Sequence, residues 1–375
     1  MAPVCICTLV TDSYRAHGEV LARSAREQNP DAEVVVLRLE TGPILELGLE
    51  RRELLRLAAI YTVAELAGAL KPYLIRHLLQ QGADTVIFLD ADTEVLAPLD
   101  LAVALASEHG VVLTPHITTP HAEFEPWFLL SGMLNAGFLA VGRDGGPFLD
   151  WWAARTVRHC HVAIHEGNCA EQRWLDFALP LFGAYVLRDP SYNVMGWNLH
   201  ERPVPPVTFF HFCGGFDPHR TDTLATMPGL PWPSPDEYPA VAEICRAYAA
   251  KLLAAGYDDA RRQPYRYGVT SDGVTLDPVI RRLYRESLLE AEAKGGDEPP
   301  NPFVEGARFV DWLLEPVGDT GLNRYLLGLH DGRADLRTVF ADVPGADSAR
   351  FIEWVIGEPT NRQTIPALFV PSADR

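Results

Sequence analysis

The sequence predicts an α/β protein whose mainly parallel, Rossmann-like sheet is covered by helices on both faces and is followed by a mainly helical C-terminal lobe. Two observations predict the sheet: short apolar segments alternate with segments of helical periodicity, and the chain opens on a strand, a helix and a strand. A change to Pro-rich and then helical sequence after residue 216 predicts the lobe. In such sheets, ligands bind beyond the carboxyl ends of the strands.

Apolar periodicity predicts the elements in chain order. The opening unit is a strand, a helix and a strand at residues 3–11, 13–28 and 33–39. A long helix at 53–81, broken near Lys71-Pro72, then leads into the apolar strand that ends at Asp90. Three further strands are predicted at residues 110–113, 136–141 and 185–187. Two helices that pack on the sheet are predicted at residues 146–158 and 170–178.

Two interruptions organise the C-terminal part of the chain, a Pro-rich stretch at 227–239 and a polar linker at 294–302. We place the domain boundary near Thr221, so that residues 1–220 form the sheet-bearing domain and residues 221–375 a mainly helical appendage. The appendage carries many large apolar side chains, which predicts that it packs on the first domain.

The composition excludes several classes of protein. With 32 Lys and Arg against 50 Asp and Glu, the formal charge of −18 disfavours binding to nucleic acid. The apolar runs are shorter than the roughly 18 residues of a membrane span, and the N-terminal residues do not read as a leader. We therefore expect a cytoplasmic protein without a transmembrane segment, which holds any phosphate group by a local device.

The most informative segment is DTVIFLDADTEVLAP, residues 84–98, in which an apolar strand runs directly into Asp90, Ala91 and Asp92. Carboxylates two residues apart can both reach a cation beyond the strand end if the turn redirects one of them. Oxygen ligands suit Mg²⁺ or Mn²⁺, which keep open positions for the phosphate oxygens of a substrate. The alternative is a tight turn in which the aspartates only support the backbone.

Together with later motifs, this segment resembles the metal-dependent glycosyltransferases of the GT-A fold, and within them family 8, the glycogenin and lipopolysaccharide galactosyltransferase type. The resemblance extends over roughly residues 3–218 and rests on elements that occur in the same order. These elements are Lys71 and Leu78-Leu79 before the strand, Asp90 to Asp92, Asn135 and Gly137 in LNAGFLAVGR, Glu171, Gln172 and Asp176 in EQRWLD, Tyr192 and Asn193 in SYNV, and His211 and Gly214 in FFHFCGGFDP.

The resemblance implies a GT-A fold and a reaction. That reaction moves a hexosyl group from a nucleoside-diphosphate sugar, expected to be a UDP-sugar, to a hydroxyl acceptor, with retention of the anomeric configuration. A Mn²⁺ or Mg²⁺ ion would be held by Asp90, Asp92 and His211 and would neutralise charge on the departing diphosphate.

The resemblance also implies roles for other residues. The implied catalytic residues, beside the anomeric carbon, are Gln172, Glu171 and Asp176. The implied donor-binding residues are Thr8, Thr11, Asp12, Tyr14, Lys71, Asp90, Ala91, Asp92, Asn135, Gly137, Asn193 and Gly214. Of these, Lys71 would be the first basic side chain at the diphosphate, and Tyr14 would either stack on the base or lie at the surface.

One position departs from the family pattern, and two other functions stay open. Where family 8 places a phosphate-holding Lys, this chain has Asp217, so that His219 or Arg220 would have to substitute. The first alternative is a catalytically inactive GT-A module that binds carbohydrate or serves in assembly. The second is an inverting enzyme, in which Glu171 or Asp176 would be the general base.

The acceptor is left open by the sequence. A neutral glycan, a lipid-linked sugar, a small natural product and a protein side chain all qualify, whereas the charge of −18 disfavours a polyanion. Residues 115–132 are expected to overhang the acceptor site with Phe124, Trp127 and Phe128 exposed, or else to form a packed surface excursion. The sequence predicts no oligomeric state.

Overall fold

The computed structural model describes residues 3–202, 205–226, 229–319, 321–358 and 360–371. The chain forms two compact units. The first comprises Met1–Arg51 and Val63–Tyr265 and contains the sheet, and the second comprises Arg52–Thr62 and Arg266–Arg375. Among the described residues, no helix is both long enough and apolar enough to cross a membrane.

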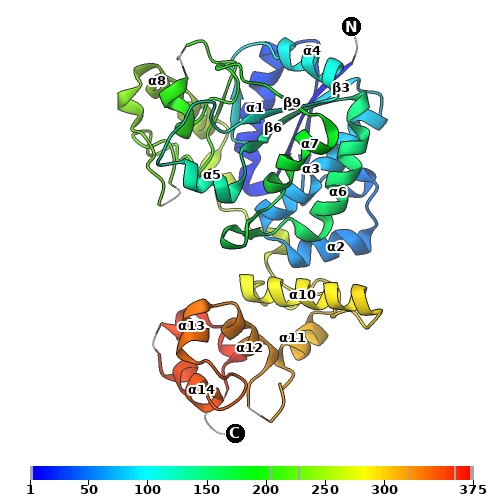
Figure 1. The fold of residues 1–375 in the computed structure, drawn as a ribbon, viewed down its shortest axis with the longest axis vertical. Coiled ribbons are helices and arrows are strands. Elements are labelled where there is room, and N and C mark those ends of the chain that lie inside the picture. The colour runs from blue at the N-terminus through cyan, green and yellow to red at the C-terminus, as the bar shows by residue number, and fades with distance from the viewer. Residues whose placement is uncertain (1–2, 203–204, 227–228, 320, 359, 372–375) are drawn as a thin grey trace. The chain divides into compact units, whose positions relative to one another are not determined.

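A six-stranded sheet forms the centre of the first unit (Figure 1). Its spatial order is β2 (Glu33–Arg38), β1 (Val4–Val10), β3 (Thr85–Leu89), β6 (Leu134–Gly142), β5 (Val111–Pro115) and β9 (Tyr185–Val186). The pairs β2 with β1, β1 with β3, and β5 with β9 are parallel, whereas β6 runs antiparallel to both of its neighbours. The predicted α/β class with a mainly parallel sheet is confirmed.

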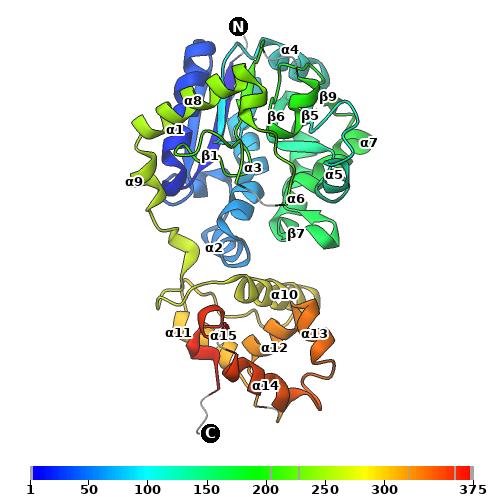
Figure 2. The same ribbon diagram turned by 90° about the vertical axis from the view of Figure 1, so that its left-hand side faces the viewer.

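Helices cover both faces of this sheet (Figures 1 and 2). On one face, α1 (Arg15–Gln28) and α4 (Asp100–His109) pack in one core with alternate strand residues such as Ile87. The intervening Phe88 points the other way, where Lys71 of α3 lies over its ring. This second face carries α3 (Val63–Gln80) and α6 (Gly146–His159).

A short antiparallel ladder extends from the carboxyl end of β3. It pairs β4 (Thr93–Val95) with β10 (Phe209–His211) and sets His211 opposite Thr93. The Phe212 N–H also donates to the Asp92 carbonyl at 2.7 Å. The ladder therefore brings two segments more than a hundred residues apart in sequence to the end of one strand.

The predicted helix break near Lys71-Pro72 is wrong. The interruption lies instead at Tyr61 and Thr62, between α2 (Arg51–Ile60) and α3, and α3 continues through Pro72. A proline inside a helix costs a hydrogen bond and some strain. Burial of most of the surrounding turns of α3 offsets that cost. The break falls where the chain returns from the second compact unit to the first.

The region predicted as a helix at 170–178 is a 3₁₀ helix, Gln172–Phe177, followed by α7 (Ala178–Phe182). The segments before it contain α5 (Glu125–Ser131) and a small hairpin of β7 (Val162–Ala163) with β8 (Asn168–Cys169).

The compact units divide the chain after Tyr265, later than the boundary that the sequence places at residue 220. The difference arises because α8 (Pro239–Ala254) packs its apolar face against α1, with Val241, Tyr248 and Leu252 in one core with Val20. The following helix, α9 (Tyr257–Arg261), belongs to the same unit. The change to Pro-rich sequence after residue 216 therefore lies within the first unit and does not mark the boundary between the two units.

The second unit is mainly helical in its described part, as the sequence predicts for the end of the chain. Its helices besides α2 are α10 (Pro278–Lys294), α11 (Gly306–Leu314), α12 (Arg324–Asp331), α13 (Ala334–Val339), α14 (Ser348–Gly357) and α15 (Asn361–Thr364). The buried Arg281 guanidinium ties the segment 52–62 into this unit by donating to the carbonyls of Ala58 and Tyr61. Packing of these helices against the first unit stays a prediction.

Candidate metal centre

Three side chains that could hold a metal ion gather at the carboxyl end of β3. Asp90 and Asp92 follow the strand, and His211 reaches them from the β4–β10 ladder. One ligand atom from each residue lies within 4.8 Å of the others, and no other such group occurs among the described residues. The His211 Nε2 atom is 3.3 Å from the Asp92 carboxylate and 4.0 Å from that of Asp90.

Hydrogen bonds behind His211 determine which of its ring nitrogens faces the aspartates. The backbone N–H of Gly137 donates to Asn135 Oδ1, so that this oxygen is an acceptor. The Asn193 atom 3.1 Å away must then be the amide Nδ2, which turns Asn193 Oδ1 toward His211 Nδ1. His211 Nδ1 therefore carries the proton in the neutral ring, and the lone pair of Nε2 is directed at Asp90 and Asp92.

Gly137 is needed for space beside this imidazole. A Cβ at position 137 would overlap His211 Cε1 and lie 2.8 Å from both His211 Nδ1 and Asn135 Oδ1. The residues Asn135, Gly137 and Asn193, which the resemblance implies as donor-binding, lie behind the His211 ring in the structure. Their contacts with one another orient His211.

Electrostatics make the three ligands a suitable set for a cation. Burial raises the pKa of Asp90 despite the attraction of Lys71 and His211. For Asp92, burial opposes ionisation, but His211 outweighs it and lowers the pKa. For His211, burial opposes protonation, but Asp92 and Asp90 outweigh it and raise the pKa. Two carboxylates and one imidazole that compete for protons fit a divalent ion such as Mn²⁺.

A buried ammonium group lies beside this centre. Lys71 Nζ is 2.9 Å from Asp90 Oδ1, 2.7 Å from Glu171 Oε1 and 3.0 Å from the carbonyl oxygen of Ala136. Burial disfavours its charge, but Asp90 and Glu171 outweigh burial and raise the pKa of Lys71. All three N–H donors of the ammonium are thus engaged by the protein. Lys71 could bind a diphosphate, as the resemblance implies, only by exchanging one of these bonds.

The Glu171 carboxylate is held against helix α3, where it contacts Lys71 and Gly68. The carboxylate packs so closely on Gly68 that a Cβ there would overlap Oε2. The preceding residue, Ala170, adopts a left-handed conformation with φ 48°, and the Glu171 carbonyl accepts from Trp152 Nε1 at 3.1 Å. The strained turn at Ala170 therefore presents Glu171 to Lys71.

The structure places the other two implied catalytic residues differently. Gln172 Oε1 accepts from the backbone N–H of Ala136, and Nε2 donates to the Ser131 carbonyl at 3.0 Å. Asp176 accepts from the Met133 N–H and pairs with Arg173. Neither side chain lines the pocket beside the metal centre, whereas Glu171 does.

That pocket, of about 420 Å³, lies at the carboxyl ends of β1 and β3 against the first turns of α3. Seven residues that the resemblance implies line it: Thr11, Tyr14, Lys71, Asp90, Ala91, Asp92 and Glu171. Among the described residues, its charged lining consists of four carboxylates and two cations, Glu65, Asp90, Asp92 and Glu171 against Lys71 and Arg261.

Several implied residues lie outside the pocket lining. Thr8 is buried within β1, and the Asp12 carboxylate accepts from Arg38 Nε at 3.0 Å. Gly214 adopts φ +83° and packs near Trp232. His219, proposed as a substitute for the missing Lys, pairs with Asp258 at 2.8 Å. Neither His219 nor Arg220 lines the pocket.

The Tyr14 side chain lines the pocket and is packed between two neighbouring side chains. Its ring stacks on that of His17 at a centroid distance of 4.5 Å, and the Arg261 guanidinium lies 5.5 Å from its centre. Sequence reasoning missed Arg261, because no motif marks α9 and the residue follows the boundary placed at 220. The sequence offered one indirect signal: an acidic protein that binds a phosphate group needs at least one basic residue near it.

The segment 115–132 does not expose its aromatic residues as expected. Phe124 and Phe128 are buried in a cluster with Met195 and Trp197, and Trp127 is half-buried against it. These residues instead fit the alternative, a packed surface segment, because their rings contact apolar side chains of the 195–197 segment.

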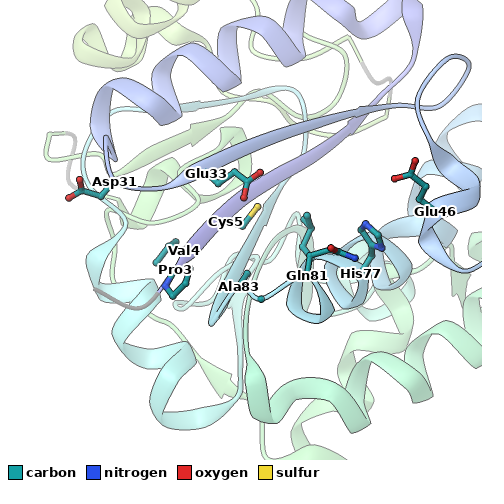
Figure 3. A pocket seen from close by; sticks show the side chains of 11 residues that line it. Pro3, Val4, Cys5, Asp31, Glu33, Glu46, His77, Gln81 and Ala83 are labelled. Carbon is teal, nitrogen blue, oxygen red and sulfur yellow. The ribbon is translucent and has the colours of Figure 1, made fainter.

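A second cavity, of about 590 Å³, lies at the opposite, amino-terminal ends of β1 and β3 (Figure 3). Its lining includes Asp31, Glu33, Glu46 and His77. Glu46 and His77 are labelled on one side of the cavity in Figure 3, and Asp31 lies on the other. Ligands of sheets of this kind bind at the carboxyl ends of strands, where the metal centre lies.

Glycosyltransferases of known structure resemble the chain. An enzyme involved in glycosylation of the major capsid of PBCV-1 is 15% identical, with 56% of this chain and 94% of that one covered and a TM-score of 0.39. The galactosyltransferase LgtC, in complex with donor and acceptor sugar analogues, is 17% identical, with 66% and 95% covered and a TM-score of 0.42. GlyE of Streptococcus pneumoniae TIGR4 is 14% identical, with 72% and 67% covered and a TM-score of 0.42.

No protein-family profile matches the sequence, and no curated protein matches it.

Gly137→Ala should weaken metal binding, because the added Cβ forces the His211 ring away from Asn193 and from the aspartates. We expect a loss of Mn²⁺ affinity of about tenfold to a hundredfold, the size typical of lost support behind a ligand. Gly146→Ala at the start of α6, where a Cβ meets nothing within 4 Å, is the matched control. Calorimetric titration measures both variants, and equal affinities would contradict the role of Gly137.

Lys71→Met should destabilise the first unit, because it leaves the half-buried Asp90 carboxylate and the buried Glu171 carboxylate without their cation. We expect a loss of about 3 to 5 kcal/mol at pH 7. Removal of Lys71 raises the pKa of Asp90 further above its unfolded value, so that the loss shrinks as pH falls and Asp90 takes up a proton.

Urea unfolding of the Lys71→Met protein at pH 5 and pH 8 measures this difference. Arg76→Met on the same helix, whose partner Asp150 is largely exposed, is the control and should cost less than about 1 kcal/mol. A loss for Lys71→Met that is independent of pH would refute the electrostatic explanation.

Proposed function

We propose that this chain is a metal-dependent glycosyltransferase. It would transfer a hexosyl group from a nucleoside-diphosphate sugar, with UDP as the nucleotide, to a hydroxyl acceptor. The observation that carries the proposal is the group of Asp90, Asp92 and His211 ligand atoms within 4.8 Å of one another, two of these residues lining a pocket at the carboxyl ends of β1 and β3.

The residues of the centre divide the work. Asp90, Asp92 and the Nε2 atom of His211 would hold a Mn²⁺ or Mg²⁺ ion, and Asn193 would hold the His211 ring in the tautomer that exposes this atom. When bound, such an ion neutralises the negative charge that develops on a departing diphosphate. The four carboxylates of the lining outnumber its two cations, so that the pocket by itself repels a diphosphate.

The pairing of the candidate carboxylates favours retention of configuration. An inverting enzyme needs a carboxylate base, yet Glu171 is engaged by the Lys71 ammonium and Asp176 is paired with Arg173 away from the pocket. Retention needs no such base, because a phosphate oxygen of the leaving group can take the proton of the acceptor hydroxyl. Glu171 would then lie near the sugar as a fixed negative charge, which stabilises a developing oxocarbenium ion.

The acceptor is proposed only by class. A neutral glycan, a lipid-linked sugar, a natural product or a protein hydroxyl suits a chain with a formal charge of −18, and a nucleic acid does not. A cytoplasmic location stays an expectation from the sequence.

UDP binding should depend on the metal and on Asp92. With Mn²⁺ present we expect measurable affinity by calorimetry, and chelation or Asp92→Asn should each reduce it about a hundredfold or more, because the pocket then repels the diphosphate. Asp144→Asn, an exposed aspartate after β6, is the control and should bind as the wild type does. Equal UDP affinity with and without metal would remove the proposed function.

The stereochemistry of the product tests the reaction. With a suitable UDP-sugar and acceptor, the anomeric coupling of the new glycosidic bond in the proton NMR spectrum should show the configuration of the donor. An inverted product would mean that a carboxylate acts as base, and the arrangement of Glu171 and Lys71 would then have to change during turnover.

A further inference from the structure

The pocket beside the metal centre has two cationic side chains in its described lining, Lys71 and Arg261. They differ in how their donors are used. Lys71 is 4% exposed, and its three donors are taken by Asp90, Glu171 and the Ala136 carbonyl. A phosphate oxygen that approached Lys71 would have to displace one of these internal partners.

Arg261 is in the opposite situation. It ends α9 and is exposed, and it makes no ion pair with any described side chain. Its guanidinium lies over the Tyr14 ring at 5.5 Å from the centre. The adjacent Arg262, by contrast, pairs with Asp259. Arg261 thus brings an uncompensated charge and a planar set of N–H donors to the pocket.

We propose that Arg261 binds the diphosphate of the nucleotide donor in this pocket, an inference that rests on the proposed function. A guanidinium can donate two parallel hydrogen bonds to a phosphate, which makes it the side chain best suited to this group. The contact with the Tyr14 ring keeps the guanidinium at the pocket. Because the guanidinium faces the ring with its plane, the N–H groups at its edge can still donate to a phosphate.

Tyr14 connects Arg261 to the metal centre. Burial raises the pKa of Tyr14 to about 12, with the Asp92 charge adding to the rise and the Arg261 charge opposing it. The same ring is therefore within electrostatic reach of a metal ligand and of the guanidinium. Arg261, Tyr14, Asp90 and Asp92 also line one pocket, so that a diphosphate bound to an ion held by Asp90 and Asp92 would enter the space that Arg261 borders.

The neighbouring histidine does not supply this charge. His17 stacks on Tyr14, and burial lowers its pKa to about 4 although the Asp92 charge opposes the fall. His17 is therefore neutral near pH 7 and serves to hold the Tyr14 ring. Arg261 is then the cation that an anion entering this side of the pocket meets.

The test compares UDP with uridine, because the two ligands differ only in the diphosphate. Binding of each is measured in the presence of Mn²⁺ with the wild type, Arg261→Ala, Arg261→Lys and Arg262→Ala, by calorimetry for UDP and by saturation-transfer NMR for uridine. We expect Arg261→Ala to weaken UDP binding about tenfold or more and to leave uridine binding unchanged. The UDP affinity of Arg261→Lys should lie between those of the wild type and Arg261→Ala, and the UDP affinity of Arg262→Ala should equal that of the wild type.

The outcomes separate this inference from the proposed function. If the wild type binds UDP only with Mn²⁺ and Arg261→Ala binds it equally well, the role of Arg261 is overturned and the proposed function stands. If Arg261→Ala weakens UDP and uridine alike, Arg261 does not act on the phosphates and the inference fails. A wild type that binds no UDP with Mn²⁺ overturns both. Thermal melting of each variant shows that the fold is retained.

Discussion

A single buried ammonium group, that of Lys71, holds together the parts of the site that come from distant segments. Its three donors join the end of β3 at Asp90, the 170–172 turn at Glu171 and the backbone of β6 at Ala136. Two carboxylates this close would repel one another in a low dielectric without a cation between them. Lys71 therefore allows a pocket lined by several carboxylates to exist inside a folded chain, and any positive charge that acts on a ligand must come from another group.

The second constraint is space beside small residues. Gly68 admits the Glu171 carboxylate against α3, and Gly137 admits the His211 ring against β6. The hydrogen bonds from Gly137 N–H to Asn135 Oδ1, from Asn193 Nδ2 to Asn135 Oδ1 and from His211 Nδ1 to Asn193 Oδ1 then set the tautomer of His211. Close packing and a fixed hydrogen-bond network thus convert residues from separate strands into one preorganised ligand set.

Sequence alone predicted much of this arrangement but not how its parts interact. Alternating apolar segments gave the strands of the sheet, and the Asp-Ala-Asp run after β3 marked the strand end at which His211 also lies. Spacing could not tell that Lys71 faces carboxylates rather than a ligand, because that depends on the burial of Glu171. Nor could it find Arg261, since α9 reaches the pocket through tertiary packing of α8 and α9 on α1. The helix break was misplaced because tertiary burial overrides the local cost of Pro72.

The position of a bound Mn²⁺ ion, measured by anomalous scattering from crystals grown with Mn²⁺ and UDP, tests the proposed metal centre directly. We expect one strong peak bounded by the carboxylates of Asp90 and Asp92 and by Nε2 of His211, with the diphosphate on its open side. Ordered UDP in this pocket with no peak at these three residues, or a peak held by other side chains, would contradict the proposed metal centre.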